Sequence, residues 1–361
     1  MHNSTATAFA TPSLQDPSAG ALAAPASPLA GATDRWQAWD HFLEATPAAG
    51  FMQASWWADF RANVGYDHFA VIARHRGAII GGALVQKFAF APGHCCYYMQ
   101  DGPVLPDDES EAAEVFAAIV EEVEDHRRNE SQTVSHLRIE PRWQRLPAFV
   151  SGFRPLAFRD RYVEPRDTLC IDLRAPEEEI LAQMKPKGRY NIRVAKRHGV
   201  SILQEDCESG IADFLRIYSD MACRQGIDAK HSVYFETLLP MLASLRRGSI
   251  FFAEHAGRRL AAALVVYFGP RATYFYGGSL DEHRQAMAPY LLHFEIMRRA
   301  KAMGHECYDL WGVAPQNQPD HPWQNISAFK RKFGGSEISL VPTLDYVYDS
   351  GAYDRYAASR S

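Results

Sequence analysis

The chain has 361 residues, of which 47% are hydrophobic and 22% are charged, and its formal net charge at pH 7 is -5. This composition predicts a globular protein with a sizeable core and two domains. It excludes binding of a nucleic acid through overall charge, so any such contact must come from a local basic patch. Six scattered cysteines without a C-x-x-C pair favour reduced thiols over disulfides or a zinc site, and no apolar run reaches the ~20 residues of a membrane span.

Residues 1–33 are dominated by Ala, Ser, Thr, Pro and Gly and contain no Lys or Arg. Secretory signals need a positive segment and transit peptides need arginines, so neither fits. We expect a disordered tail that precedes the first domain.

A first domain is expected over residues 34–166. Trp36, Trp39, Phe42 and Leu43 recur at helical spacing after Asp34, which we expect to cap that helix. The remaining predicted elements are a helix over Ser55–Asn63, strands over Phe69–Arg74, Ile79–Phe90 and Cys95–Met99, a helix over Ser110–Arg127 and a strand over Val134–Ile139.

A second domain, over residues 167–341, repeats this plan. The hairpin around Gly77 has a counterpart around Gly257, and in both halves a helix and then a strand follow. The expected second-half elements are strands over Val200–Gln204 and Cys307–Val313, helices over Ile211–Gln225, Tyr234–Leu245 and Pro289–Met303, and a last strand over Ile338–Tyr348. Such self-similarity predicts a duplicated α/β unit whose element order is that of the GNAT acyltransferase fold.

Acetyl-CoA, the usual ligand of that fold, is not expected here. A CoA pyrophosphate needs a glycine-rich turn whose backbone N–H groups meet it where a helix begins. The corresponding turns read D-G-P-V-L-P-D-D-E, which is acidic, and R-Q-A-M-A-P-Y, which lacks glycine.

The strongest basic patch lies between Lys185 and Arg197. On a helix, Arg189, Arg193 and Lys196 fall at i, i+4 and i+7 and form one stripe, with Lys187 just before it. A basic stripe suits a phosphate backbone, as in an RNA acceptor stem. The alternative is an ordinary solvated helix face.

A block from Cys307 to Gly335 organises the second half: a short strand, a proline-rich loop and a helix that ends at Gly334. Ile326, Phe329 and Phe333 should share the core-facing side of this helix. Lys330 is expected at the edge of that apolar stripe, where an ammonium needs an anionic partner or a ligand. The alternative is a lysine that extends to water.

Within this block, D-L-W-G-V-A-P, H-P-W and F-K-R-K-F-G-G closely resemble the C-terminal signature of the Fem family. A second hallmark, K-x-R-Y-N-I-R-x-A-x-R-x-G-V, begins at Lys187. The resemblance implies tandem GNAT-like domains in which residues 342–361 complete the first domain, without the coiled-coil arm of some members. It also implies an aminoacyltransferase that moves an amino acid from aminoacyl-tRNA to the side-chain amine of a peptidoglycan precursor.

The resemblance assigns roles residue by residue. Lys330 is the candidate catalytic cation at the tRNA 3′ end, and Phe329 shapes the site. An aminoacyl ester is already activated, so the enzyme needs positioning and an oxyanion donor rather than a nucleophilic triad. Substrate contacts are expected from Arg61, Glu140, Lys230, Tyr234 and Tyr276, and tRNA contacts from Lys187, Arg189, Arg193, Lys196, Arg331 and Lys332.

Tyr276 is preferred over Tyr274, with which it should share a strand face, because it adjoins Gly277 and Gly278. Taken alone, Arg61 would be an ordinary surface arginine. Glu140 stands where the family usually has Asp.

The expected partners are aminoacyl-tRNA and either UDP-MurNAc-pentapeptide or lipid II, with no cofactor and no metal. The expected location is the cytoplasm, with peripheral attachment at the inner face of the membrane left open. Two alternatives remain: a Fem-like transferase that acts on a small-molecule amine, and a non-catalytic binding module derived from tandem GNAT domains. The sequence leaves open which amino acid and tRNA are used, how many residues are added, and the oligomeric state.

Overall fold

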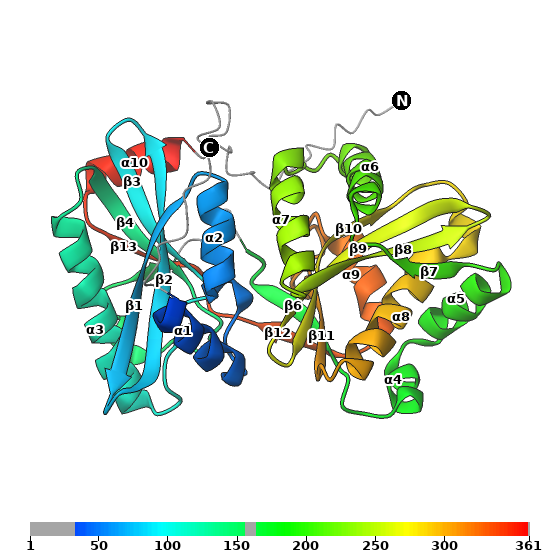
Figure 1. Ribbon diagram of the computed structural model, residues 1–361, viewed down its shortest axis with the longest axis horizontal. Helices are drawn as coiled ribbons and strands as arrows, with labels where there is room; N and C mark the ends of the chain where they lie inside the picture. The colour runs from blue at the N-terminus through cyan, green and yellow to red at the C-terminus, as the bar shows by residue number, and fades with distance from the viewer. Residues whose placement is uncertain (1–32, 156–163, 360–361) are drawn as a thin grey trace. The chain divides into compact units, whose positions relative to one another are not determined.

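The computed structural model describes residues 33–155 and 164–359 (Figure 1). The described chain divides into two compact units. The first unit takes the residues up to Arg166 together with those from Ser339 on, and the second unit takes Asp167–Ile338. The predicted tail, residues 1–33, lies outside the described residues except for Thr33, which is helical.

The first unit is a mixed sheet with helices on both faces, in the strand order β1-β2-β3-β4-β13-β5. Its elements are α1 Thr33–Ala45, η1 Phe51–Gln53, α2 Ser55–Asn63, β1 Asp67–His75, β2 Ala78–Ala91, β3 His94–Gln100, α3 Glu109–Arg128, β4 Thr133–Glu140, η2 Ala148–Val150, β5 Arg154–Pro155, β13 Leu344–Val347 and α10 Ser350–Ala358. Neighbouring glycines of β2 show the two faces, because Gly81 lies against Val115 of α3 and Gly82 against Trp39 of α1.

The second unit is a larger mixed sheet in the strand order β12-β6-β11-β10-β9-β8-β7. Its elements are β6 Asp167–Asp172, α4 Glu177–Gln183, α5 Pro186–Arg197, β7 Ser201–Gln204, α6 Glu208–Gln225, α7 Ser232–Ser244, β8 Gly248–His255, β9 Arg258–Phe268, β10 Arg271–Ser279, η3 Arg284–Ala286, α8 Ala288–Ala302, β11 Cys307–Gly312, α9 Gln324–Lys330, η4 Arg331–Phe333 and β12 Ser336–Ser339. Within the described residues of this unit, α6 and α7 are 18 and 13 residues long, and no extended helical arm leaves the sheet.

The duplicated plan predicted from the sequence is confirmed. In each unit two antiparallel hairpin strands lead to a third strand, a helix and a fourth strand, which lies parallel to the third: β3 with β4, and β10 with β11. The two hairpins turn in the same way, since Gly77 and Gly257 both take a positive φ (87° and 73°). Only glycine adopts this conformation without strain, which explains why both turns carry it.

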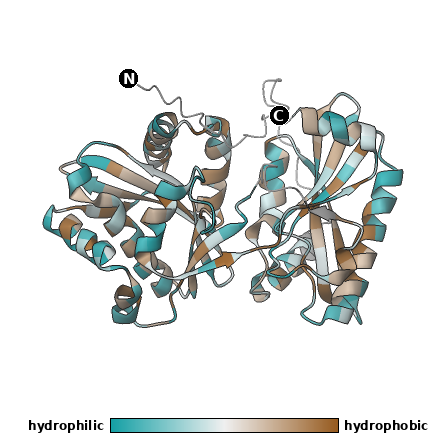
Figure 2. Ribbon diagram, turned by 180° about the vertical axis from the view of Figure 1, so that it is seen from behind, coloured by the Kyte–Doolittle hydropathy of each residue, from teal (hydrophilic) through white to brown (hydrophobic). Residues whose placement is uncertain are grey.

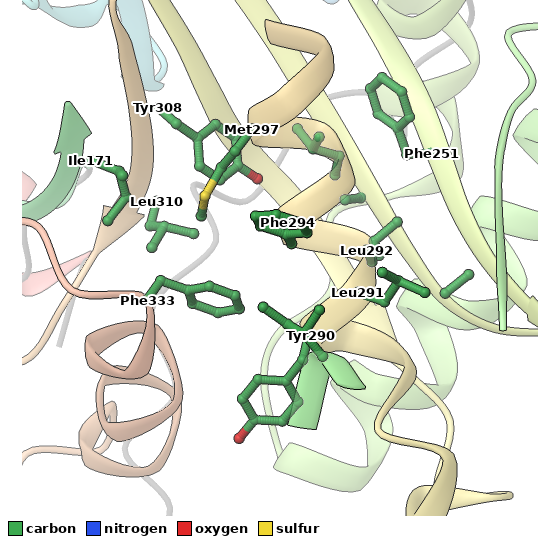
Figure 3. Packing of buried hydrophobic residues seen from close by; sticks show 14 of the residues in the cluster. Ile171, Phe251, Tyr290, Leu291, Leu292, Phe294, Met297, Tyr308, Leu310 and Phe333 are labelled. Atoms are coloured by element: carbon green, nitrogen blue, oxygen red, sulfur yellow. The ribbon is translucent and has the colours of Figure 1, made fainter. Parts of the chain in front are cut away.

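The core of the second unit lies between its sheet and the pair α5 and α8. Figure 3 shows Leu292, Phe294 and Met297 of α8 pointing toward strand residues of this cluster. Phe333, which is fully buried, enters the same cluster from η4 (Figure 3). Hydrophobic and hydrophilic segments alternate along the helices, as expected of amphipathic helices that cover a sheet (Figure 2).

Two predicted elements are wrong at the ends of the chain. The single last strand over Ile338–Tyr348 is two strands, β12 and β13, which belong to different sheets. Pro342 lies between them and cannot donate to a strand ladder, so the run is interrupted. The first helix already includes Asp34 rather than being capped by it.

Candidate active site around Lys330

Lys330 is buried, with 6% of its surface exposed, on the core side of α9. The expected position at the edge of an apolar stripe is wrong. The α-helix ends at Lys330 and continues as the 3₁₀ turn η4, so the buried residues are Ser327, Lys330 and Phe333, spaced by three. Ile326, which should have faced the core, is 40% exposed for the same reason.

The Lys330 ammonium donates a hydrogen bond to the carbonyl oxygen of Gly312 over 2.7 Å. It also lies over the ring of Tyr274, 5.7 Å from its centroid. Burial lowers the pKa of Lys330 to about 8, and the charge of Asp309 partly opposes that shift. The alternative of a lysine extending to water is therefore wrong, and the ammonium is held where a developing negative charge would be stabilised strongly.

Phe329 packs beside Lys330 and is half-buried. Its ring centroid lies 5.0 Å from that of Tyr290, 5.6 Å from that of His293 and 5.3 Å from that of Phe333. These contacts fix the orientation of α9 against α8. They accord with a residue that shapes the site, a role that stays a prediction.

His293 on α8 is a site residue that the sequence reasoning missed. Its Nδ1 is 2.8 Å from the Tyr308 hydroxyl, and its ring stands edge-on to Tyr274 with centroids 4.6 Å apart. Burial, with the nearby charge of Lys330, lowers the pKa of His293 to about 3, so the imidazole is neutral at pH 7. The signal in the sequence is a histidine inside the apolar run Y-L-L-H-F of an amphipathic helix.

Asp309, also missed, is fully buried in the middle of β11. One carboxylate oxygen accepts hydrogen bonds from the Thr168 hydroxyl and, over 2.9 Å, from the Trp311 N–H; the other is 3.0 Å from an Arg271 guanidinium nitrogen. Although burial alone would lower it, the charge of Asp309 raises the pKa of Arg271. A carboxylate inside the apolar strand C-Y-D-L-W-G was the available signal, because buried charges are rare unless they are paired.

The basic helix α5 starts against the segment that carries Lys330. The Lys185 N–H donates to the Lys332 carbonyl over 3.0 Å, and a Cβ on Gly188 would meet the same oxygen at 2.5 Å. Gly188 therefore permits a contact that a side chain would prevent. The predicted basic helix is confirmed, although it begins at Pro186, and it lies close in space to the Lys330 turn.

The predicted tRNA-contact residues divide into exposed and engaged groups. Lys187, Arg193 and Lys196 are exposed, and in the described part of the chain none forms an ion pair. Arg189 turns back and donates to the carbonyls of Ala182, over 3.1 Å, and Met184. The exposed basic stripe therefore contains Arg193 and Lys196, with Lys187 before it, but not Arg189.

Arg331 and Lys332, which were also expected to contact tRNA, both bind other groups of the second unit. Arg331 pairs with Glu337 over 2.7 Å and donates to the Ala314 carbonyl. Lys332 donates to the Tyr290 hydroxyl over 2.9 Å. To contact tRNA as predicted, Arg331 and Lys332 would have to use N–H groups that are not already donating to Glu337, Ala314 or Tyr290.

Lys230, Tyr234 and Tyr276 are brought together on the face of the sheet covered by α6 and α7. The Lys230 ammonium lies 5.6 Å from the centroid of the Tyr234 ring, whose own centroid is 5.9 Å from that of Tyr276. Tyr234 is buried and Tyr276 is half-buried. The three residues predicted to contact one substrate therefore form one cluster.

Tyr274 and Tyr276 do not share a strand face as expected. Tyr274 pairs with Val265 and Tyr276 with Leu264, so β10 carries an extra residue, a β-bulge, between them. An extra residue breaks the two-residue alternation. Tyr274 consequently points toward His293, and Tyr276 toward Phe235 of α7.

In the first unit, Arg61 is buried rather than on the surface, with 7% exposed. Its Nε donates to the Gln86 amide oxygen over 3.2 Å, and its guanidinium stacks 3.6 Å from the centroid of the Tyr66 ring. Glu140 is the last residue of β4, one residue beyond the predicted strand, and accepts hydrogen bonds from the hydroxyls of Tyr98 and, over 3.0 Å, Thr343. Substrate roles for both stay predictions.

The start of α3 in the first unit is occupied by the protein's own carboxylate. Asp108 caps the helix and accepts from the backbone N–H groups of Ser110 and Glu111, each over 3.0 Å, and the first turn carries Glu109 and Glu111. This arrangement uses the donors that a pyrophosphate would need. In the described ranges, no cluster of His, Cys, Asp or Glu is arranged to hold a metal, and none of the helices there has the length and apolar character needed to span a bilayer.

Comparison with known proteins supports this description. Over 383 aligned residues, covering 87% of this chain and 92% of the relative, the sequence is 20% identical to a lipid II:glycine glycyltransferase of Staphylococcus epidermidis. It is 27% identical over 195 residues, 53% of this chain and 56% of the relative, to a UDP-N-acetylmuramoylpentapeptide-lysine N(6)-alanyltransferase of Weissella viridescens.

Among solved structures, the crystal structure of FemX matches with a TM-score of 0.80 and 17% identity, over 89% of this chain and 98% of that chain, which confirms the predicted fold. The family model for the FemAB family matches residues 155–244 and 248–359. The signature motifs, the duplicated fold and this match together show that the chain belongs to the FemAB family.

Proposed function

We propose that this protein is an aminoacyltransferase that moves an amino acid from an aminoacyl-tRNA to the side-chain amine of a peptidoglycan precursor. The observation that carries the proposal is Lys330, a buried ammonium whose pKa is lowered by burial and which donates to one backbone carbonyl. It lies in the Cys307–Gly335 block, whose motifs resemble the Fem signature. Curated relatives with these activities support the substrate class.

The chemistry follows from the donor. An aminoacyl ester is activated, so an amine attacks its carbonyl directly, and a tetrahedral intermediate with a negative oxygen forms. The Lys330 ammonium stabilises that oxygen, while neutral His293 and the Tyr274 ring exclude water around it. The new amide forms as the C–O bond to the tRNA ribose breaks, and the hydroxyl leaves with the proton released from the attacking amine.

The basic helix α5 supports aminoacyl-tRNA as the donor. The helix begins beside the turn that carries Lys330, and its exposed cations are Lys187, Arg193 and Lys196. At 1.5 Å per residue, these side chains are spread over roughly 15 Å of helix that a phosphate backbone could follow. We propose that the acceptor stem lies along this track with its 3′ ester at Lys330. The enzyme then acts in the cytoplasm, where charged tRNA is available.

We propose that the acceptor contacts Lys230, Tyr234 and Tyr276, the cluster in the second unit. Cations and tyrosine hydroxyls suit a diphosphate and a sugar. The named relatives act on either a lipid-linked or a nucleotide-linked precursor, so both are candidates.

The test uses the purified full chain with a set of charged tRNAs, acetyl-CoA as a competing donor, and three acceptors: UDP-MurNAc-pentapeptide, lipid II and a panel of small amines. Mass spectrometry of the acceptor should show the addition of an aminoacyl residue only with charged tRNA. Transfer to small amines alone would point to the small-molecule transferase, transfer from acetyl-CoA would overturn the donor, and binding without transfer would favour the non-catalytic module.

A further inference from the structure

Strand β11 contains an irregularity directly before the carbonyl that holds Lys330. Its pairing with β6 steps from Asp309 opposite Cys170 to Gly312 opposite Thr168, so β11 carries one extra residue. Within it Trp311 takes φ +62°, a left-handed conformation that is a clear outlier for so large a residue. Such strain persists only where the surroundings enforce it.

The Asp309 carboxylate provides that enforcement. It accepts from the Trp311 N–H two residues ahead, over 2.9 Å, and is itself fixed by the Thr168 hydroxyl and by Arg271. An Asp side chain that bonds the backbone two residues on stabilises a turn. The turn brings the Gly312 carbonyl to 2.7 Å from the Lys330 ammonium.

Asp309 acts on Lys330 by charge as well. Of the groups that face the ammonium, His293 on α8 is neutral at pH 7 and Tyr274 on β10 presents its ring. Asp309 on β11 is the carboxylate whose charge raises the pKa of Lys330 against the effect of burial. Arg271, with a guanidinium nitrogen 3.0 Å from an Asp309 carboxylate oxygen, neutralises part of that charge.

We propose that Asp309 is a positioning residue for Lys330: it fixes the Trp311–Gly312 turn whose carbonyl aims the ammonium, and it keeps the ammonium charged. The role of the ammonium in transfer rests on the proposed function. The placement and charge of the ammonium do not, and they are measurable without any substrate.

The experiment compares Asp309→Asn, which removes the charge, with Asp309→Glu, which keeps the charge but lengthens the side chain. Asp172→Asn is the matched control, because Asp172 lies on the adjacent strand β6, also pairs with an arginine, and is exposed. The readout is the protonation midpoint of the Lys330 ammonium, followed by NMR of the full chain with ¹⁵N-labelled lysine and assigned by the signal lost in Lys330→Met.

We expect Asp309→Asn to move the Lys330 midpoint about one pH unit lower or more, because it removes an opposite charge near the ammonium. Asp172→Asn should keep the wild-type midpoint, and Asp309→Glu, which keeps the charge, should lower it less than Asp309→Asn does. A wild-type midpoint in Asp309→Asn would overturn the proposal, since a merely structural role predicts that result.

Transfer assays supply the second readout. Asp309→Glu should lower kcat at least ~10-fold at pH 7 because a displaced carbonyl misaims the ammonium. If Asp309→Asn does not fold, this variant decides, and a wild-type kcat would overturn the proposal. If the wild-type chain transfers nothing from any charged tRNA, the proposed function fails, while the NMR midpoints still test Asp309.

Discussion

A buried cation of each unit lies at its sheet, Arg138 in the first unit and Lys330 in the second, and the two are satisfied in opposite ways. In the first unit, Arg138 of β4 forms a two-pronged pair with Asp345, with distances of 2.8 and 2.7 Å, and donates to the Tyr356 hydroxyl over 3.0 Å. In the second unit, Lys330 packs against β11, the counterpart of β4, and its hydrogen bond goes to the neutral carbonyl of Gly312.

The difference appears in the pKa values. Although burial alone would do the opposite, the hydrogen bonds and charge of Asp345 raise the pKa of Arg138 well above its usual value, and those of Arg138 lower the pKa of Asp345. Burial lowers the pKa of Lys330 to about 8 with only partial opposition from Asp309. The first cation is therefore matched by a buried carboxylate within the fold, whereas the second has only partial compensation, which is what the role that we propose for it requires.

The largest expected effect is the loss of stability on removing Arg138, the buried cation of the first unit. Arg138→Met should lower the free energy of unfolding by about 3–5 kcal/mol, because it leaves Asp345 buried without its partner. Urea or thermal unfolding of the full chain measures the loss. The double variant Arg138→Met/Asp345→Leu should recover most of it, since an apolar pair replaces both charges; a single variant as stable as wild type would contradict the assignment.

Lys330→Met tests the second half. We expect transfer to fall by a factor of ~100 or more, in line with the loss of an oxyanion donor. The free energy of unfolding should stay level or rise. Burial lowers the pKa of Lys330 from 10.5 to about 8, so the charged lysine destabilises the folded state; this effect is full below about pH 8 and fades as the pH rises toward 10.5.

Lys301→Met is the matched control for that variant. Lys301 also donates to a backbone carbonyl, that of Leu173, over 2.6 Å, but it lies at the end of α8. It should retain near-normal transfer. Near-normal turnover in purified, folded Lys330→Met would remove Lys330 from the mechanism.

The pH dependence sharpens the role of the ammonium. With a folded pKa of about 8, Lys330 is charged below that pH and neutral above it. If the charged form stabilises the oxyanion, single-turnover transfer should fall as the pH rises through about 8; if the neutral form were a base, transfer would rise there. In Lys330→Arg this alkaline limb should disappear, because a guanidinium stays charged over the whole range.

The smallest effects belong to cations that are exposed rather than buried. Arg193→Gln should weaken tRNA binding only a few-fold and lower the slope of log K against log salt by about 1. Arg174→Gln, which removes another exposed arginine of the same unit, should leave the slope unchanged. Arg189→Gln should change it less than Arg193→Gln, because Arg189 donates to carbonyls of α4 and the residue after it. Equal slopes for all three would argue against α5 as the RNA track.

The sequence predicted the duplicated plan and most elements because hydrophobic periodicity and turn glycines are local signals. The hairpins at Gly77 and Gly257, the helix that became α3 and the strand that became β11 were all read from such patterns. The patterns placed Lys330 only at the edge of an apolar stripe, and its candidacy as the catalytic cation came from the resemblance to the Fem family.

Predictions from local patterns were wrong where the register between paired strands shifts. The bulge in β10 separates Tyr274 from Tyr276, and the bulge in β11 places Trp311 at a positive φ. Neither bulge can be recognised from the spacing of residues in the sequence. Arg61 likewise reads as a surface residue, and its burial against Tyr66 and Gln86 arises from the strands that cover it.

The sequence by itself determined the family, the two-fold repetition of an α/β plan and the segment that holds the candidate cation, because these depend on residue order and on the period of apolar side chains. Only the tertiary structure decided how that cation is held. Asp309, His293 and Gly312 come from two elements separated from α9 in sequence, and the burial that lowers the pKa of Lys330 arises only when those elements pack together.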